Sequence, residues 1–149
     1  MHLIQILAAL LAPTIAIVTT YIAVQQYRAN KLKIRLELFE KRYAVYEGAK
    51  TFVSIAGRDG TLSNDAFFKL NESTKDAFFL FDDSVDQYIQ LLRENGARLK
   101  YLTDRLADQS LPVGEERNAL SAEATELRIW FGNQFLDSKQ AFKKYLRVL

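Results

Sequence analysis

The chain has 149 residues, 49% of them hydrophobic and 26% charged, and its formal net charge is +2. This length accommodates one modest domain rather than two full ones. The chain contains no cysteine, which excludes disulfides, thiolate catalysis and cysteine-based zinc sites, and its one histidine is His2. We therefore expect neither an enzyme nor a cofactor-binding protein of the usual kinds, because their common ligand and nucleophile sets cannot be assembled.

Charge divides the chain into two parts. Residues 1–26 carry no charged side chain, whereas all 38 charged residues lie from Arg28 onward. Residues 28–42 have a net charge of +4, and the part after them has a net charge of −2. The basic excess therefore directly follows the apolar N-terminal segment.

The apolar segment from Leu3 to Val24 predicts a membrane-spanning helix. Its 22 residues would extend about 33 Å as a helix, which is enough to cross a hydrocarbon core of roughly 30 Å. A removable signal peptide is the competing interpretation, but it would carry positive charge before a shorter apolar run and a small-residue cleavage site after it. The positive charge here follows the run, so we expect a retained anchor with Met1 outside and Leu149 in the cytoplasm.

Two tyrosines and four basic residues flank the end of this segment: Tyr21, Tyr27, Arg28, Lys31, Lys33 and Arg35. Amphipathic tyrosines and basic side chains are typical of the membrane–water interface. Such a basic cluster can also bind nucleic acid, but anionic lipid headgroups are the nearest polyanion to a membrane anchor. We therefore expect lipid contact and no nucleic-acid binding, with residues 1–27 as the anchor and residues 28–149 as a cytoplasmic domain.

Polar residues also occur inside the predicted span, at Gln5, Thr14, Thr19 and Thr20. Their side chains can hydrogen-bond to another membrane helix, which is worth about 0.6–2 kcal/mol per contact. Threonine hydroxyls can also bond to carbonyls of their own helix. The first interpretation predicts a partner inside the membrane, and the second requires none.

The predicted helix continues beyond the membrane, because no glycine or proline interrupts residues 21–47. Apolar residues then recur at alternating spacings of three and four, with Ala49 substituting where Lys50 interrupts the pattern. They are Leu32, Leu36, Phe39, Tyr43, Tyr46 and Val53. Such a stripe packs against other helices, and the two glycines within residues 57–60 predict the turn that ends it.

Two short helices are predicted next, over residues 65–70 and from residue 74 to about residue 81. Ser73 followed by Asp76 resembles a helix cap, in which the serine hydroxyl accepts a hydrogen bond from a free backbone amide. The dense apolar run AFFLF over residues 77–81 predicts the centre of the hydrophobic core.

Two longer helices complete the predicted fold. One begins near Asp83, has Gly96 as a weak point, and places six apolar residues on one side: Val85, Ile89, Leu92, Leu99, Leu102 and Leu106. The other follows a break at residues 110–114 and carries a heptad-like row of Leu120, Ala124, Leu127, Phe131, Phe135, Ser138, Phe142, Tyr145 and Leu149. We predict an all-α fold, in which the single transmembrane helix continues into an antiparallel bundle of three long helices with two short ones covering an end or side.

Three candidate sites remain within this pattern. Asp82, Asp83 and Asp86 lie close enough in sequence to bind Mg²⁺ or Ca²⁺, although capping of the following helix explains them more simply. Lys50 marks a partner site or a buried ion pair, unless its ammonium group reaches solvent. Trp130, which precedes Phe131, belongs either to a docking surface or to the core.

Three motifs complete the reading of the sequence: LFEKR at residues 38–42 followed by VYE at 45–47, FFLF at 78–81, and FKKYL at 142–146. Together they resemble a broad group of small, uncharacterised bacterial proteins with one N-terminal transmembrane helix and a helical tail. The resemblance covers most of the chain. It implies a bacterial inner-membrane location and no particular activity.

These observations lead us to expect a membrane-anchored interaction module that binds a protein partner or forms a homo-oligomer, without catalysis. The alternative is an accessory subunit of a transport or signalling complex that contacts its partner through the transmembrane helix. An enzyme with a cation at the three aspartates is a third possibility.

Overall fold

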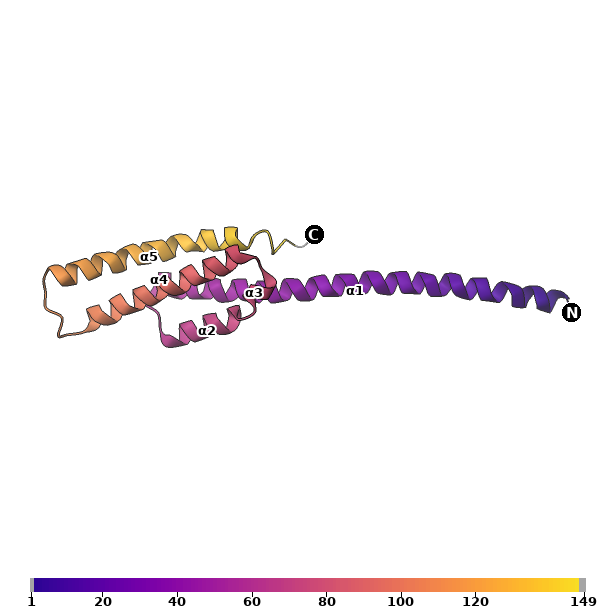
Figure 1. The fold of residues 1–149 in the computed structure, drawn as a ribbon, viewed down its shortest axis with the longest axis horizontal. Helices are drawn as coiled ribbons and strands as arrows, with labels where there is room; N and C mark the ends of the chain where they lie inside the picture. Colours follow the sequence, from indigo (N-terminus) through magenta and orange to yellow (C-terminus); the bar gives the residue numbers. More distant parts are fainter. Residues whose placement is uncertain (1, 148–149) are drawn as a thin grey trace. The chain divides into compact units, whose positions relative to one another are not determined.

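The computed structural model describes the backbone of residues 2–147 and, except at residues 2–4 and 7–9, their side chains. It contains five helices, shown in Figure 1: α1 (His2–Asp59), α2 (Asn64–Thr74), α3 (Ala77–Leu80), α4 (Asp83–Ala107) and α5 (Glu115–Phe142). No strand occurs within residues 2–147. The predicted all-α class is confirmed, and Leu149, the last member of the predicted C-terminal row, lies outside the described residues.

The chain divides into two compact units, Met1–Leu38 and Phe39–Leu149. The first contains only the N-terminal part of α1, whose residues 10–38 are all exposed. Among the described residues, α1 is the helix that is long and apolar enough to cross a membrane. The second unit, which we call the bundle, contains the rest of α1 and the other four helices. The basic segment 28–38, predicted as part of the cytoplasmic domain that begins at residue 28, belongs to the first unit.

Four helices of the bundle alternate in direction: the C-terminal part of α1, then α2, α4 and α5 (Figure 1). The Phe52 ring lies 5.2 Å from Phe67 of α2 and 6.2 Å from Phe131 of α5. Because α2 carries the chain back along α1, α4 runs parallel to α1. Of the three long helices, α5 alone is antiparallel to the other two. This corrects the predicted scheme of three long antiparallel helices, since α2 occupies a full place in the bundle.

The turn between α1 and α2 forms where the two glycines predicted it. Gly60 has a φ of 64°, a left-handed conformation that glycine adopts without a steric penalty. The Gly60 carbonyl accepts a hydrogen bond from Arg128 Nε of α5 at 3.1 Å. This hydrogen bond connects the turn to α5.

The boundaries of α2 and α3 differ from the prediction, because the cap is a different serine. Ser63 caps α2, and its hydroxyl accepts a hydrogen bond from the Ala66 amide at 3.2 Å. The Ser73 hydroxyl instead donates to the Leu70 carbonyl within α2, and Asp76 makes no side-chain cap for α3. As a result α2 runs on to Thr74, and α3 has only four residues.

The core of the bundle lies between α1, α2, α4 and α5 rather than at the AFFLF run. Of that run only Ala77 is buried, while Phe78 and Phe79 are 69% and 82% exposed. The prediction of a core centre at residues 77–81 was wrong, since a helix of one turn can face the core with only one side. The largest fully buried side chains are Phe52, Phe131, Phe142, Leu70, Ile89, Leu92, Leu99 and Leu102.

The two predicted apolar rows are confirmed in part. Five of the six residues predicted on one side of α4 are buried, and Leu106 packs against the core from a half-buried position. In α5 Gln134 takes the buried place predicted for Phe135, and its amide nitrogen donates to Asp137 Oδ2 at 3.1 Å. α5 ends at Phe142, so Tyr145 follows the helix.

Two glycines permit close packing of helices inside the bundle. A Cβ atom at Gly96 would lie 2.6 Å from Cζ of Phe52. The absence of a side chain at Gly96 thus lets α4 lie against the Phe52 ring of α1. A Cβ atom at Gly48 would lie 2.4 Å from Cβ of Ser73 on α2. Gly96, predicted as a weak point of its helix, is therefore a packing site.

Candidate functional site

The interface residues predicted from the sequence lie along α1. Tyr21, Tyr27, Arg28, Lys31, Lys33 and Arg35 are all exposed. The Tyr21 hydroxyl accepts a hydrogen bond from Gln25 Nε2 at 3.0 Å, and Lys33 Nζ lies 3.8 Å from Glu37 Oε1. The structure does not gather these six residues into one cluster, because they occupy successive turns of a single helix.

The threonines inside the apolar segment bond to their own helix. The hydroxyls of Thr14, Thr19 and Thr20 donate to carbonyl oxygens four residues earlier, at 2.5, 2.9 and 2.7 Å. Each hydroxyl thus has an acceptor within α1. These hydroxyl groups do not by themselves require a second helix as a partner.

An apolar row begins within the basic segment of α1 and continues beyond it. Leu32 and Leu36 are 67% and 53% exposed, and Tyr43 is 43% exposed. Phe39, half-buried, stacks on Tyr43 with ring centroids 5.9 Å apart. These four residues, here called the α1 seam, belong to the apolar stripe that was predicted to pack against other helices. Leu32 and Leu36 lie outside the buried part of α1, which begins near Val45 and Tyr46, so the bundle of the same chain does not cover them.

The end of the bundle near Tyr46, where α1 enters it, brings together α3 and the C-terminal end of α5. Arg42 Nε donates to the Leu80 carbonyl at 3.1 Å, and its guanidinium carbon lies 5.4 Å from the centroid of the Tyr145 ring. The Phe81 ring lies 5.0 Å from the same tyrosine. We call this surface the entry end.

Two aromatic side chains project from α3 at the entry end. The rings of Phe78 and Phe79 meet edge to face at 5.5 Å, and both are mostly exposed. Side chains of this size normally contribute to a core or an interface, where they bury about 150–250 Å² each. Adjacent exposed phenylalanines are therefore the clearest candidate for a docking surface on the bundle.

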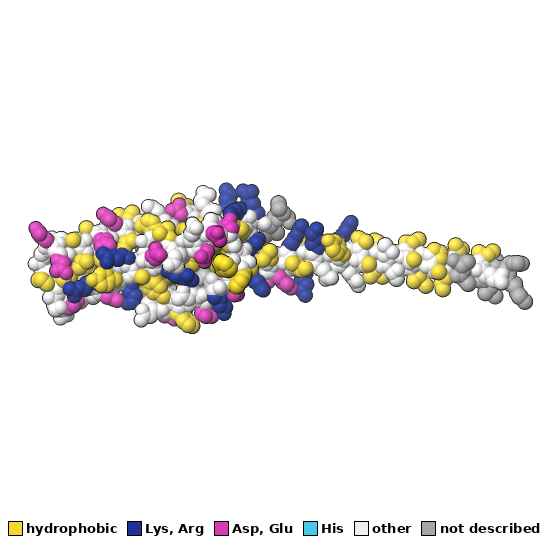
Figure 2. Space-filling model, viewed as in Figure 1, with side chains coloured by type: hydrophobic (Ala, Val, Ile, Leu, Met, Phe, Trp, Pro, Cys, Tyr) yellow, Lys and Arg dark blue, Asp and Glu magenta, His cyan; other side chains and the backbone are white. Residues whose placement is uncertain are grey.

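A second basic cluster lies beside the entry end. Lys139, Lys143 and Arg147 line a shallow pocket of about 480 Å³ together with Tyr46 and two other residues. The space-filling view shows basic side chains gathered over this end of α5 (Figure 2). This cluster was not predicted, although residues 139–147 contain four basic side chains and no acidic one.

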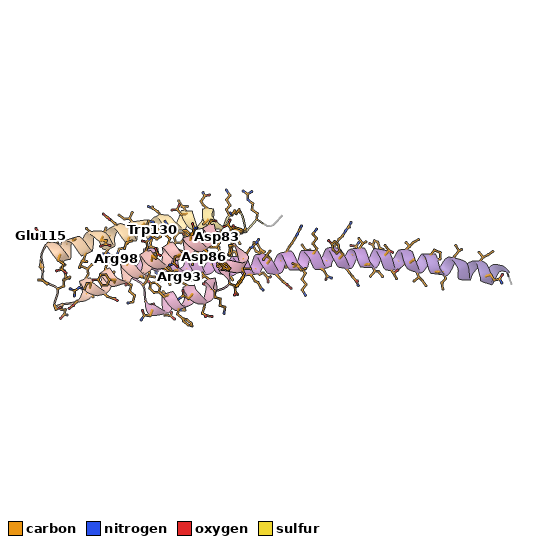
Figure 3. The ribbon with its side chains drawn as sticks, viewed as in Figure 1. Asp83, Asp86, Arg93, Arg98, Glu115 and Trp130 are labelled. Atoms are coloured by element: carbon orange, nitrogen blue, oxygen red, sulfur yellow. The ribbon has the colours of Figure 1, made fainter. Side chains whose placement is uncertain are left out.

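The three aspartates near the start of α4 do not form a cation site. The Asp82 carboxylate accepts hydrogen bonds from the Ser84 amide at 3.1 Å and from Lys144 Nζ at 2.5 Å. Asp83 and Asp86 lie in the first turn of α4, as Figure 3 shows. Within the described residues no group of three or more acidic, His or Cys side chains is arranged to hold a metal ion. Asp82 caps the helix.

The ion pair at Asp82 makes stability depend on pH. Lys144, and then the Ser84 and Tyr145 hydroxyls, hold the pKa of Asp82 well below its ordinary value of 3.8. The Asp82 carboxyl therefore binds a proton more readily in the unfolded chain than in the folded one. The contribution of the Asp82 contacts to stability is complete above about pH 4 and is lost as the pH falls further. Asp82→Asn should lower stability at neutral pH and flatten the acid decline.

This prediction is checked by urea unfolding of the full chain in mild detergent from about pH 6 down to about pH 2. Asp86→Asn serves as the control, because it removes a carboxylate from the same turn without breaking the Lys144 contact. A parallel acid decline in wild type and Asp82→Asn would contradict the assignment.

Lys50 and Trp130 occupy ordinary structural positions. Lys50 Nζ lies 3.4 Å from Glu47 Oε1, and a hydrogen bond to this carboxylate raises the pKa of the lysine. One prediction for Lys50 was a buried ion pair. The structure contradicts it, because the pair with Glu47 is partly exposed. Trp130 of α5 is half-buried, and its ring packs edge to face on Phe131 at 4.9 Å (Figure 3). Of the two interpretations of Trp130, the structure favours the core.

Two buried polar atoms in the described residues lack a hydrogen-bond partner, the Tyr88 hydroxyl and Arg93 Nε. Burial raises the pKa of Tyr88, so the phenol stays neutral. Arg93 Nη2 donates to the Thr74 hydroxyl at 2.9 Å and ties α4 to the end of α2 (Figure 3). The two residues lie apart on α4 and form no common site.

No family model, curated protein or solved structure matches this chain.

Proposed function

We propose that this protein is a single-pass membrane protein of the bacterial inner membrane, whose bundle lies in the cytoplasm and binds protein rather than catalysing a reaction. The length and composition of α1 support the anchor. The basic residues from Arg28 to Arg42 support a cytoplasmic bundle, because such residues are retained on that side.

The observation that carries the binding function is the exposed pair Phe78 and Phe79. The core contacts of this segment come from Phe81, whose ring packs on Phe142 at 5.3 Å, and from Leu80, so Phe78 and Phe79 are not used by the bundle itself. Two adjacent phenylalanines in water are unfavourable, because burying each would stabilise the protein by about 1.5–3 kcal/mol. A protein partner that covers them would recover that free energy. The absence of cysteine and the single histidine support a role without catalysis.

The test isolates the tagged full chain from bacterial membranes in mild detergent and identifies the proteins bound in stoichiometric amounts. We expect Phe78→Ser/Phe79→Ser to lose the bound partner. Phe68→Ser is the matched control, because Phe68 is 65% exposed on α2, away from the pair. A lone monomer for wild type, or equal binding by the double variant, would contradict the proposal.

A second variant separates this function from the accessory-subunit alternative. Replacing Leu3 to Val24 with leucines keeps the anchor and removes the side chains that a transmembrane partner would recognise. We expect partner binding to survive this exchange, since α3 contributes the contact. Loss of binding would assign recognition to the membrane helix instead.

A further inference from the structure

The α1 seam is a second unpartnered surface, separate from Phe78 and Phe79. We propose that two copies of this chain associate in parallel through the α1 seam and form a two-stranded coiled coil next to the membrane. This inference rests on the proposed single-pass anchor, and it names a second copy of the chain as the partner for this surface.

The spacing along α1 is that of a coiled coil. Leu32, Leu36, Phe39 and Tyr43 are separated by four, three and four residues, which places them at successive core positions of a heptad repeat. The same register continues backward through Ala29 and Gln25 to a further row inside the apolar segment, at Ile22, Val18 and Ile15, all exposed along α1. A single polar residue in such a row is tolerated and helps to set the register.

Exposure shows that Leu32 and Leu36 are uncovered within the first unit of the chain. Every residue from 28 to 38 is exposed, including Leu32 and Leu36. Leaving two leucines in water is unfavourable, because burying each would stabilise the protein by about 1.5–3 kcal/mol. A parallel partner would cover both leucines.

The charges beside the seam fit a second copy in parallel. In a parallel coiled coil the residue before one core position faces the residue five places later on the other chain. Arg35 of one copy thereby faces Glu40 of the other, and the pair occurs twice by symmetry. Both copies enter the same membrane in the same orientation, which excludes the antiparallel arrangement. Arg28 would face Lys33, a like-charged pair that anionic headgroups would neutralise.

The natural absence of cysteine makes the inference directly testable. Single variants Leu32→Cys and Leu36→Cys in the full chain are oxidised in native membranes, and covalent dimers are separated by mass. A disulfide requires Cα atoms within about 7 Å, so only residues at the seam can form one. Ile34→Cys is the matched control, because Ile34 is an apolar residue of similar exposure (65%) on the other side of α1.

We expect a covalent homodimer for Leu32→Cys and for Leu36→Cys, and none for Ile34→Cys. Equal crosslinking at Leu36 and Ile34, no crosslinking at any position, or adducts only of another mass would overturn the proposal. In the Leu36→Cys background, Arg35→Glu or Glu40→Arg alone should reduce the dimer band, and the two together should restore it. Additive loss in the double variant would also count against the parallel pairing.

The outcomes separate this proposal from the proposed function. If the dimer fails while Phe78 and Phe79 still determine binding of another protein, only the coiled coil is wrong. If the dimer forms while that binding is absent, the seam is correct and the docking surface on α3 is not.

Discussion

Replacing Phe142 with alanine should lower the free energy of unfolding of the bundle by about 3–5 kcal/mol. The side chain is fully buried, and its ring lies 5.5 Å from Tyr46, 5.3 Å from Phe81 and 6.3 Å from Tyr88. Truncation would remove contacts to α1, α4 and the segment after α3 together, and would leave a cavity at their junction. Trp130, the single tryptophan, reports unfolding by its fluorescence during urea titration of the full chain in mild detergent.

Phe79→Ala is the matched control for this experiment. The chemical change is identical, but Phe79 is 82% exposed, so we expect a change within about 0.5 kcal/mol. A loss at Phe79 as large as that at Phe142 would mean that the core lies at the AFFLF run after all. Similar small effects at both positions would also contradict the packing described above.

Gly48→Ala should destabilise the bundle by about 2 kcal/mol, because it overpacks the contact between α1 and α2. The new Cβ atom would lie 2.4 Å from Ser73 Cβ, an atom that no rotation about χ1 can move. Alanine also favours the helix by about 1 kcal/mol relative to glycine, so the net loss is smaller than the steric cost alone. Urea unfolding measured as for Phe142 gives the difference.

Two further variants test the cause of this loss. Gly132→Ala should instead stabilise the bundle by up to about 1 kcal/mol, because no heavy atom lies within 4 Å of its new Cβ. The double variant Gly48→Ala/Ser73→Gly should be more stable than the sum of the two single changes in the free energy of unfolding predicts, since Ser73→Gly removes the clashing Cβ atom. Strict additivity, or destabilisation by Gly132→Ala, would argue against close packing as the reason.

Sequence patterns predicted those helix boundaries that local chemistry determines. The start of α4 at Asp83, the turn after α1 and the break before α5 each carry a cap, a glycine or a proline that acts within a few residues. The buried row of α4 followed from periodicity, because one side of that helix meets the core over its whole length.

The predictions that failed depended on tertiary contacts. A dense apolar run identifies buried residues only if the element is long enough to turn several of them inward, and α3 has one turn. The direction of α4 relative to α1 depended on α2 being long enough to return the chain, and the competing serines 63 and 73 concealed that length. The α1 seam was correctly identified as an apolar stripe, but its spacing alone does not tell whether the chain itself or another chain covers it.

Some residues of the candidate site could likewise be predicted from the sequence, and others could not. The basic residues that follow the apolar segment could be found from charge alone. Phe78, Phe79 and the Lys139 cluster could not, because their importance comes from α3 and the end of α5 meeting at the entry end. The four basic residues within 139–147 were visible in the sequence, but their place beside α1 was not.

The alternation of four helices also has a mechanical consequence. α1 enters and α5 ends at the same end of the bundle, where the Tyr46 and Phe142 rings meet. A pulling force applied between the N-terminal part of α1 and a load attached after α5 would therefore peel these helices apart one contact at a time. A load attached at the loop of residues 108–114, at the opposite end, would have to shear the whole length of the bundle at once. The attachment point would thus decide whether the bundle opens under small forces or resists large ones.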